Sequence, residues 1–161
     1  MYAKYGYYPK LEATPEISKR YSHDVVLHIR NIEKTPERPN PERNMDLEFA
    51  SEILRLLYKA GKSVVIVGAD RVHDSFGMLP HVKDYRNTLS ILGISRVIME
   101  SKLFIGRDSG MVHLAAACGC PIVAFDFQNK KWFPKMPEDK FTAFMQGAER
   151  SEILKAIRSR L

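Results

Sequence analysis

Apolar and polar positions along the chain fall into blocks that predict strands alternating with helices. Short β-branched runs have the length and composition of buried strands, and stretches with apolar residues every three or four positions predict helices. The predicted strands are 24–30, 63–67, 103–105 and 121–125, and the predicted helices are 45–60, 92–101, 109–117 and 149–161. The stretch 71–87 shows neither period clearly, and the segment after residue 125 is expected to be irregular.

Continuous apolar strands that alternate with helices predict a parallel sheet covered on both faces. Because crossovers between parallel strands are right-handed, the predicted fold class is α/β, a Rossmann-like doubly wound sheet in a single domain. This domain is expected to cover residues 21–161. Residues 1–20, with Pro9, Pro15 and a cluster of tyrosines, are expected to form a linker or tether.

Local signals predict where the first helix begins and ends. Asn44 is expected to cap it, with Asp46 and Glu48 in the first turn, where the helix dipole favours acids. Gly61 is expected to end it. The apolar stripe between these signals predicts a helix packed on the sheet.

Composition narrows the class of protein. The chain has 161 residues, of which 45% are hydrophobic and 27% charged, as in ordinary globular domains. No apolar run approaches the length of about 20 residues needed to span a bilayer, and the N-terminus lacks a signal-peptide pattern, so a cytoplasmic location is expected. Cys118 and Cys120 have the spacing of neither a disulfide nor a zinc site, and no metal site is predicted.

The net charge of +6 indicates an anionic partner, either nucleotide phosphates, acidic lipid or nucleic acid. Nucleic acid is disfavoured because the basic residues form no dense run and no helix-turn-helix, zinc-finger or RRM signature is present. Lys155, Arg158 and Arg160 on the last helix could make peripheral contact with a membrane, although a solvated face is the simpler interpretation.

Polar, glycine and charged residues follow the predicted strands. They are Arg30-Asn31, Gly68-Ala69-Asp70, Gly106–Gly110 and Asp126. In an open parallel sheet, ligands bind beyond the carboxyl ends of the strands. These residues are therefore expected to form one binding edge.

The segment Gly106–His113 predicts a strand, a tight turn and a new helix. Gly106 and Gly110 allow close approach of the backbone, and the free N–H groups of the helix suit a diphosphate. Ser109 adds a hydroxyl donor and His113 points near the same place, whereas Asp108 suits a sugar hydroxyl, a ribose or the N–H groups of the turn. A simple helix cap with a core histidine is the alternative, but a cap does not require two flanking glycines.

Arg30 lies on the same face of the first strand as His28, near this edge. Its guanidinium could neutralise the charge of a departing diphosphate, or it could simply be solvated. Lys34, Arg38 and Arg43 follow in a proline-containing loop that could fold over phosphates, although solvation is the simpler account of each. Patterns typical of NAD domains, P-loop NTPases and G-x-S-x-G hydrolases are absent.

The run Asp108-Ser-Gly-x-x-His113-Leu-Ala-Ala-Ala, followed by Gly119-x-Pro121-Ile-Val-Ala-Phe, resembles the C-terminal domain of glycosyltransferase family 9, the ADP-heptose:lipopolysaccharide heptosyltransferases. The resemblance covers about residues 20–128. It implies the donor-binding half of a two-domain GT-B enzyme, and a role in lipopolysaccharide biosynthesis. It also implies contacts from Asp108, Ser109, Gly110 and His113 to the donor, and from a loop lysine, for which Lys34 is the candidate.

The sequence departs from the family pattern at four places, of which the first is Met111-Val112 in place of Pro-Met. Arg107 and Asp126-Phe127 stand where the family has an asparagine and a glycine turn, and His28-Ile-Arg30 replaces His-Pro-Gly. His-x-Arg is similar to the GDP-fucose-using fucosyltransferases, whose arginine meets the donor phosphates. The donor is therefore expected to be an ADP- or GDP-linked sugar, with no separate cofactor.

The first hypothesis is an inverting, metal-independent transferase acting on a glycan or glycolipid acceptor, with an N-terminal-domain partner chain supplying the acceptor site. The second is a non-catalytic nucleotide-sugar-binding or scaffold subunit, and a third is a UDP-sugar epimerase-like domain. Under the first, Arg30 and Asp108 are the predicted catalytic residues. The predicted donor-binding residues are Gly68, Gly106, Asp108, Ser109, Gly110, His113 and Lys34.

Overall fold

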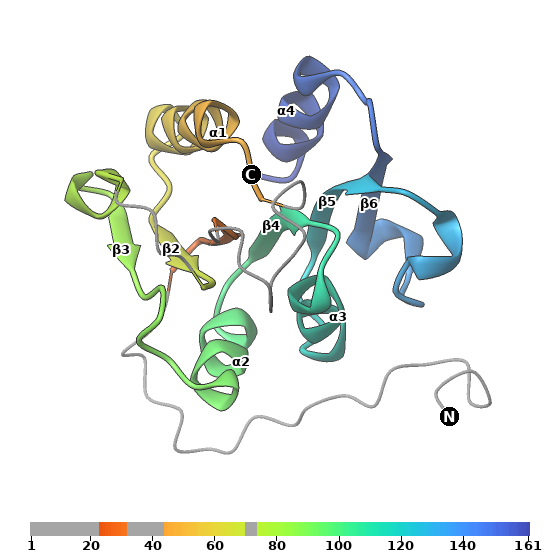
Figure 1. Cartoon of the computed structure of the whole chain (residues 1–161), viewed down its shortest axis with the longest axis horizontal. Helices are drawn as coiled ribbons and strands as arrows, with labels where there is room; N and C mark the ends of the chain where they lie inside the picture. Colours follow the sequence, from red (N-terminus) through yellow and green to blue (C-terminus); the bar gives the residue numbers. More distant parts are fainter. Residues whose placement is uncertain (1–22, 32–43, 70–73) are drawn as a thin grey trace, which may run out of the picture.

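A computed structural model describes residues 23–31, 44–69 and 74–161 as a six-stranded parallel sheet with helices on both faces (Figure 1). The strand order is β3-β2-β1-β4-β5-β6. The strands are β1 (Val25–His28), β2 (Val64–Val67), β3 (Val82–Asp84), β4 (Leu103–Arg107), β5 (Ile122–Phe127) and β6 (Phe141–Met145). The helices are α1 (Leu47–Lys59), α2 (Ile91–Met99), α3 (Gly110–Ala117) and α4 (Arg150–Ser159), with short 3-10 turns η4 (Phe76–Met78), η5 (Lys130–Trp132) and η6 (Glu138–Lys140). The predicted Rossmann-like class is confirmed.

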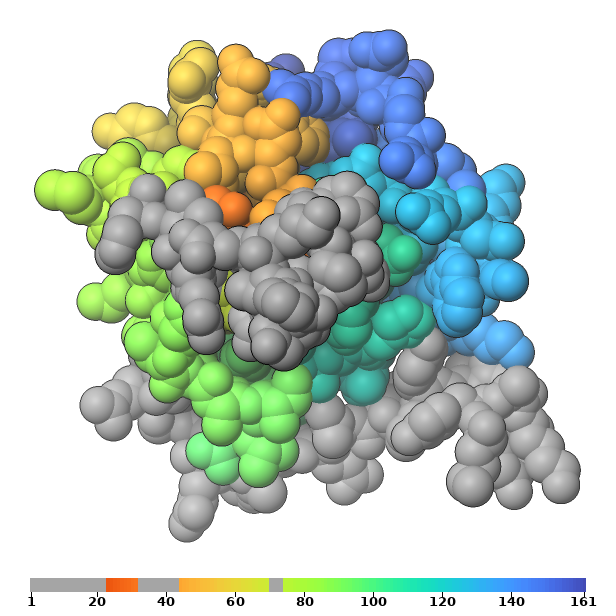
Figure 2. Space-filling view, viewed as in Figure 1, coloured from red at the N-terminus to blue at the C-terminus, as the bar shows by residue number. Residues whose placement is uncertain are grey.

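Two helical layers enclose the sheet. The helices α1 and α4 cover one face, and α2 and α3 cover the other (Figure 1). In the space-filling view, α1 and α4 accordingly lie along the upper side and α2 and α3 along the lower side (Figure 2). Val25 and Leu27 pack with the α1 and α4 layer, whereas Val26 packs with α2 and α3. This two-sided burial explains why the strands are continuous apolar runs rather than alternating ones.

The order of the strands reverses between β1 and β4. From β1 the chain builds outward through β2 to β3, and it then returns to place β4 on the other side of β1 before continuing to β5 and β6. Leu27 of β1 is in register with Ile105 of β4. The carboxyl ends of β1 and β4 therefore meet at the topological switch point, where ligands bind in sheets of this kind.

The start of α1 differs from the prediction. Asp46, not Asn44, caps the helix: its Oδ1 accepts from the N–H groups of Glu48 at 2.8 Å and Phe49 at 3.2 Å. A carboxylate favours this position because it satisfies two free N–H groups at the positive end of the helix dipole. Gly61, with φ of +66°, ends the helix as predicted.

Two strands were missed by the sequence patterns, and two extend further than predicted. Strand β3 has three residues with an exposed Lys83, and β6 is half-buried throughout, so neither gives the apolar run of a central strand. Strand β4 continues to Arg107, and β5 continues to Phe127 through an irregularity between Ala124 and Phe127. The proposed tether 1–20 lies outside the described residues. Among the described residues, no helix is long and apolar enough to cross a membrane.

Candidate functional site

The turn between β4 and α3 lies at the switch point. Ser109 occupies the N-cap position with an extended backbone, but its side chain makes no capping hydrogen bond. Its carbonyl accepts from the N–H of Val112 at 3.1 Å. The Ser109 side chain therefore does not cap the first turn of α3, and a helix N-terminus, at the positive end of the dipole, favours an anion.

The two glycines of this segment serve different purposes. Gly106 lies inside β4, where an added Cβ would be 3.1 Å from the Phe104 ring and 3.2 Å from the Cβ of His28. Gly110 begins α3 with no other heavy atom of the described residues within 4 Å of such a Cβ. Gly106 therefore makes room for packing within the protein, whereas a Cβ at Gly110 would meet none of the described residues outside its own helix and chain neighbours. The predicted contacts of both with a donor stay predictions.

Gly68 follows β2 and must be glycine. Its φ is +140°, and an added Cβ would lie 2.0 Å from the carbonyl oxygen of Ile29. No L side chain fits that space. The glycine thus brings the end of β2 against the residue that follows β1, which closes one side of the switch point.

His28 is the residue that sequence reasoning left without a role. It ends β1, is only 6% exposed, and stacks at 6.5 Å on the Phe104 ring. Its Nδ1 lies 3.4 Å from the Oγ of Ser109. Burial and, secondarily, the charge of Arg30 lower the pKa of His28 to about 4, so the ring is neutral at pH 7.

The sequence signal for His28 was its alternation with Arg30 on one strand face. Only the structure shows that the ring is enclosed and reaches the turn before α3, because the β1–β4 pairing is a long-range contact. Arg30 itself is half-buried just beyond β1. Its carbonyl accepts from the N–H of Met45 at 2.8 Å, which ties the end of β1 to the start of α1.

Arg107 is engaged with the protein beside the site. Its Nε lies 2.7 Å from Oδ2 of Asp126, and its guanidinium also donates to the carbonyl of Asn44. Asp126 has a φ of +61°, a conformation that aspartate tolerates better than most residues. This ion pair links β4, β5 and the segment before α1, and it makes Arg107 a structural neighbour of the turn.

For the remaining predicted site residues, the structure gives their burial and few contacts. Asp108 is half-buried directly after β4, and its N–H donates to the carbonyl of Phe125 at 2.9 Å. His113 is half-buried on α3. Lys34 and Asp70 lie outside the described residues. The structure therefore gathers Arg30, Asp108, Ser109 and neighbouring glycines at one edge, and it does not describe the loop lysine.

The described residues contain no group of three or more His, Cys, Asp or Glu side chains that could hold a metal ion.

Part of the chain matches a known family of proteins. Residues 51–125 match the family model described as glycosyltransferase family 9 (heptosyltransferase). The resemblance to glycosyltransferase family 9 is thereby confirmed. The matched residues run from α1 into β5 and include the whole turn before α3.

Solved structures of heptosyltransferases share the fold. ADP-heptose lipopolysaccharide heptosyltransferase II of E. coli superimposes with a TM-score of 0.68 at 16% identity, covering 94% of this chain and 53% of that protein. E. coli heptosyltransferase WaaC with ADP gives a TM-score of 0.66 at 13% identity over 88% of this chain and 46% of that protein. The same enzyme with ADP-2-deoxy-2-fluoro heptose gives 0.60 at 15% identity over 89% and 44%. None of the curated proteins matches the chain significantly in sequence.

These identities establish the fold and no more. The chain spans about half the length of the two E. coli enzymes named first, 53% and 46% respectively. The fold that this chain shares with them corresponds to about half of each of those two enzymes.

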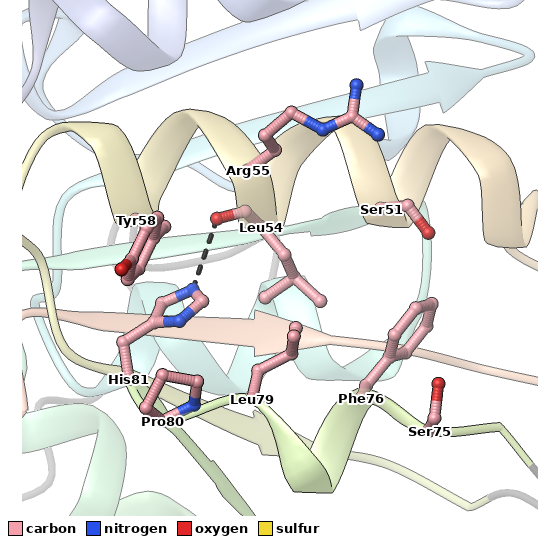
Figure 3. Close-up of a pocket in the computed structure, with 9 residues that line it drawn as sticks. All are labelled: Ser51, Leu54, Arg55, Tyr58, Ser75, Phe76, Leu79, Pro80 and His81. Atoms are coloured by element: carbon pink, nitrogen blue, oxygen red, sulfur yellow. Dashed lines mark hydrogen bonds between the residues drawn. The ribbon is translucent and has the colours of Figure 1, made fainter.

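A hollow lies away from the strand ends, among the described residues. It has a volume of about 370 Å³ and lies between α1 and the segment from η4 to β3 (Figure 3). Its lining is mainly apolar, with Leu54, Tyr58 and Phe76 among the contributors. His81 borders it and places Nε2 3.1 Å from the carbonyl of Leu54. None of the predicted site residues lines this hollow.

Proposed function

We propose that this chain is the donor-binding half, equivalent to the C-terminal half, of a GT-B glycosyltransferase. It would bind a nucleoside diphosphate sugar and support transfer of the sugar to a glycan or glycolipid acceptor. The observation that carries the proposal is the N-terminus of α3, which the side chain of its N-cap residue Ser109 does not cap, at the switch point next to the end of β1. The similar E. coli heptosyltransferase WaaC, solved with ADP and with ADP-2-deoxy-2-fluoro heptose, supports a nucleotide-sugar donor.

The charge of each group determines the part of the donor that we assign to it. The first N–H groups of α3 and the Ser109 hydroxyl would hold the diphosphate, and Arg30 would stabilise the negative charge that develops as it leaves. Asp108 would accept hydrogen bonds from hydroxyl groups of the donor, since a carboxylate repels phosphate. Gly68, Gly106 and Gly110 would shape the cleft, and His113 and Lys34 would complete the donor contacts.

The proposed transfer is inverting and independent of metal. The bond between the sugar C1 and the diphosphate breaks as the acceptor oxygen forms a bond to C1 from the opposite side. The acceptor proton passes to a base that we place outside these 161 residues. The base and the acceptor site would come from an N-terminal-type domain, in the same polypeptide or in a partner chain.

A cytoplasmic location with peripheral membrane contact suits a glycolipid acceptor and stays a proposal. The alternative function is a non-catalytic nucleotide-sugar-binding or scaffold subunit. The half-length match to the solved structures is what keeps this alternative open. Supplying an N-terminal-type partner domain and a labelled donor distinguishes the two, because only the transferase yields a glycosylated acceptor.

Donor binding is tested by calorimetry on the full chain. We expect one of the ADP-, GDP- or UDP-linked sugars to bind, and Arg30→Ala and Asp108→Ala each to weaken binding by about tenfold, as for hydrogen bonds to charged groups. Arg55→Ala, on the exposed side of α1, is the matched control and should leave the affinity unchanged. Absence of binding to all three donors, or full affinity in both site variants, contradicts the proposal.

A further inference from the structure

His28 occupies a compartment built around its ring. An added Cβ at Gly106 would lie 3.2 Å from its Cβ, and an added Cβ at Gly68 would lie 3.2 Å from its Cδ2. The ring of Phe104 covers it nearly in parallel, at an interplanar angle of 19°. Two glycines and an aromatic ring thus fix the imidazole beneath the switch point, where it is 6% exposed.

The free edge of this ring faces the turn before α3. Nδ1 is 3.4 Å from the Oγ of Ser109, at the long end of the hydrogen-bonding range. Ser109 does not use its hydroxyl to cap α3, although it occupies the N-cap position. Hydrogen bonds in unliganded sites are often long and shorten in the complex.

The direction of this hydrogen bond follows from the ligand. A hydroxyl has one proton and two lone pairs, and a phosphate oxygen without a proton can only accept. If Ser109 donates to a diphosphate, its proton is committed, and it can then only accept from His28. The proton of the neutral imidazole must therefore be on Nδ1.

We propose that His28 is a positioning residue, which donates from Nδ1 to Ser109 and so directs the Ser109 hydroxyl proton toward the diphosphate of the donor. The inference rests on the proposed donor site. It assigns to His28 an orienting role and leaves the charge of the site to Arg30. Burial keeps the ring neutral at physiological pH, in agreement with that division.

A double-mutant cycle tests this coupling with whichever of ADP, GDP and UDP the wild-type chain binds most tightly. We expect His28→Leu and Ser109→Ala each to weaken binding by about tenfold, and His28→Leu to cost less than about twofold once Ser109 is alanine. His28→Asn, whose amide can donate from nearly the same position as Nδ1, should stay within about threefold of wild type.

His81→Asn is the matched control. His81 is hydrogen-bonded to a main-chain carbonyl of α1, so this variant should alter thermal stability and leave nucleotide affinity unchanged. Nitrogen-15 NMR of the complex supplies an independent readout, with a protonated Nδ1 expected for His28. If His28→Leu lowers the melting temperature without weakening binding, weakens it equally in the Ser109→Ala background, or if Nδ1 is unprotonated, the role of His28 is refuted while the donor site stands. If the wild-type chain binds none of the three nucleotides, the donor site and the role of His28 are refuted together.

Discussion

The helices α1 and α3 both begin at the carboxyl edge of the sheet, and their first turns are completed differently. Asp46 caps α1 by accepting hydrogen bonds from two main-chain N–H groups, and its Oδ2 also lies 2.5 Å from Nη2 of Arg150. Ser109 occupies the same position on α3, yet its hydroxyl is turned toward His28. A capped helix end supplies stability, whereas one without a side-chain cap can bind an anion.

Position in the sheet separates α3 from other helices that begin at this edge. The helix α4 also starts without a side-chain cap, but it follows the edge strand β6, far from the reversal of strand order. Only at β1 and β4 does the missing side-chain cap coincide with the switch point, among the helices that the structure describes. Four experiments test the contrast between α1 and α3.

Lowering the pH should destabilise the fold first through His28, which lies beside the turn before α3. Burial lowers the pKa of His28 from the ordinary 6.5 to about 4 in the fold, so the unfolded chain binds more protons as the pH falls from 6.5 to 4. This group's contribution to stability is fully present above pH 6.5, is lost through that window, and is constant below it; 2.5 pKa units correspond to on the order of 3 kcal/mol.

The cap of α1 should be insensitive over the same range. Burial raises the pKa of Asp46, but the N–H groups of Phe49 and Glu48 and the charge of Arg150 outweigh it, so the net pKa lies below the ordinary 3.8. Urea titrations between pH 7 and pH 4.5 measure how much of the free energy of unfolding is lost as His28 protonates in the unfolded chain. His28→Asn should show a much flatter profile, and an equal slope in that variant would assign the loss to another group.

Ser109→Asp would give α3 the kind of cap that α1 has. The new carboxylate should accept the first N–H groups of the helix and repel a diphosphate, so we expect at least about hundredfold weaker nucleotide binding, near 2.7 kcal/mol. Stability should be kept or raised. The matched control is Ser90→Asp, since Ser90 caps α2 by accepting from the N–H of Gly93 at 3.2 Å. Equal losses of affinity in both variants would indicate a general charge effect.

Asp46→Ala is the reciprocal experiment on α1. Loss of the cap should lower the free energy of unfolding by about 1–2 kcal/mol, and the half-exposed pair with Arg150 should add little. Asp46→Asn should recover most of this loss because asparagine caps nearly as well. Nucleotide affinity should change by less than about twofold in both variants. A large change in affinity would show that the two helix ends are coupled through the segment that Arg107 holds at Asn44.

The sequence patterns were sufficient for the layered fold and for the turn that begins α3. They succeeded because β1, β2, β4 and β5 are buried on both faces, and strands of this kind have continuous apolar runs in the sequence. They failed at the edge strands β3 and β6, whose residues are partly exposed and whose pairing is decided by contacts with β2 and β5. The sheet, not the local sequence, makes those segments strands.

The candidate site divides in the same way. Asp108, Ser109 and Gly110 are adjacent in sequence, so a local pattern could predict them, whereas the contact between His28 and Ser109 joins positions 81 residues apart. The cap of α1 was misplaced by two residues because Asn44 and Asp46 are both good caps. Nothing local showed that the carbonyl of Asn44 is held by Arg107.

Gly110→Ala should give the smallest effect and probes the open space at α3 directly. An added Cβ meets no heavy atom of the described residues within 4 Å, and Gly110 is not in the left-handed region, so stability should rise by up to about 1 kcal/mol. The methyl group would stand at the helix N-terminus, and we expect nucleotide binding to weaken only a few-fold. Gly61→Ala is the matched control: its Cβ would also meet nothing, but its φ is +66°, so about 1 kcal/mol of stability should be lost with affinity unchanged. Thermal melts and calorimetry on the two variants separate backbone strain from ligand contact. Because an added Cβ at either position meets none of the described residues beyond its own helix and chain neighbours, unchanged affinity in Gly110→Ala would place the diphosphate away from the first turn of α3.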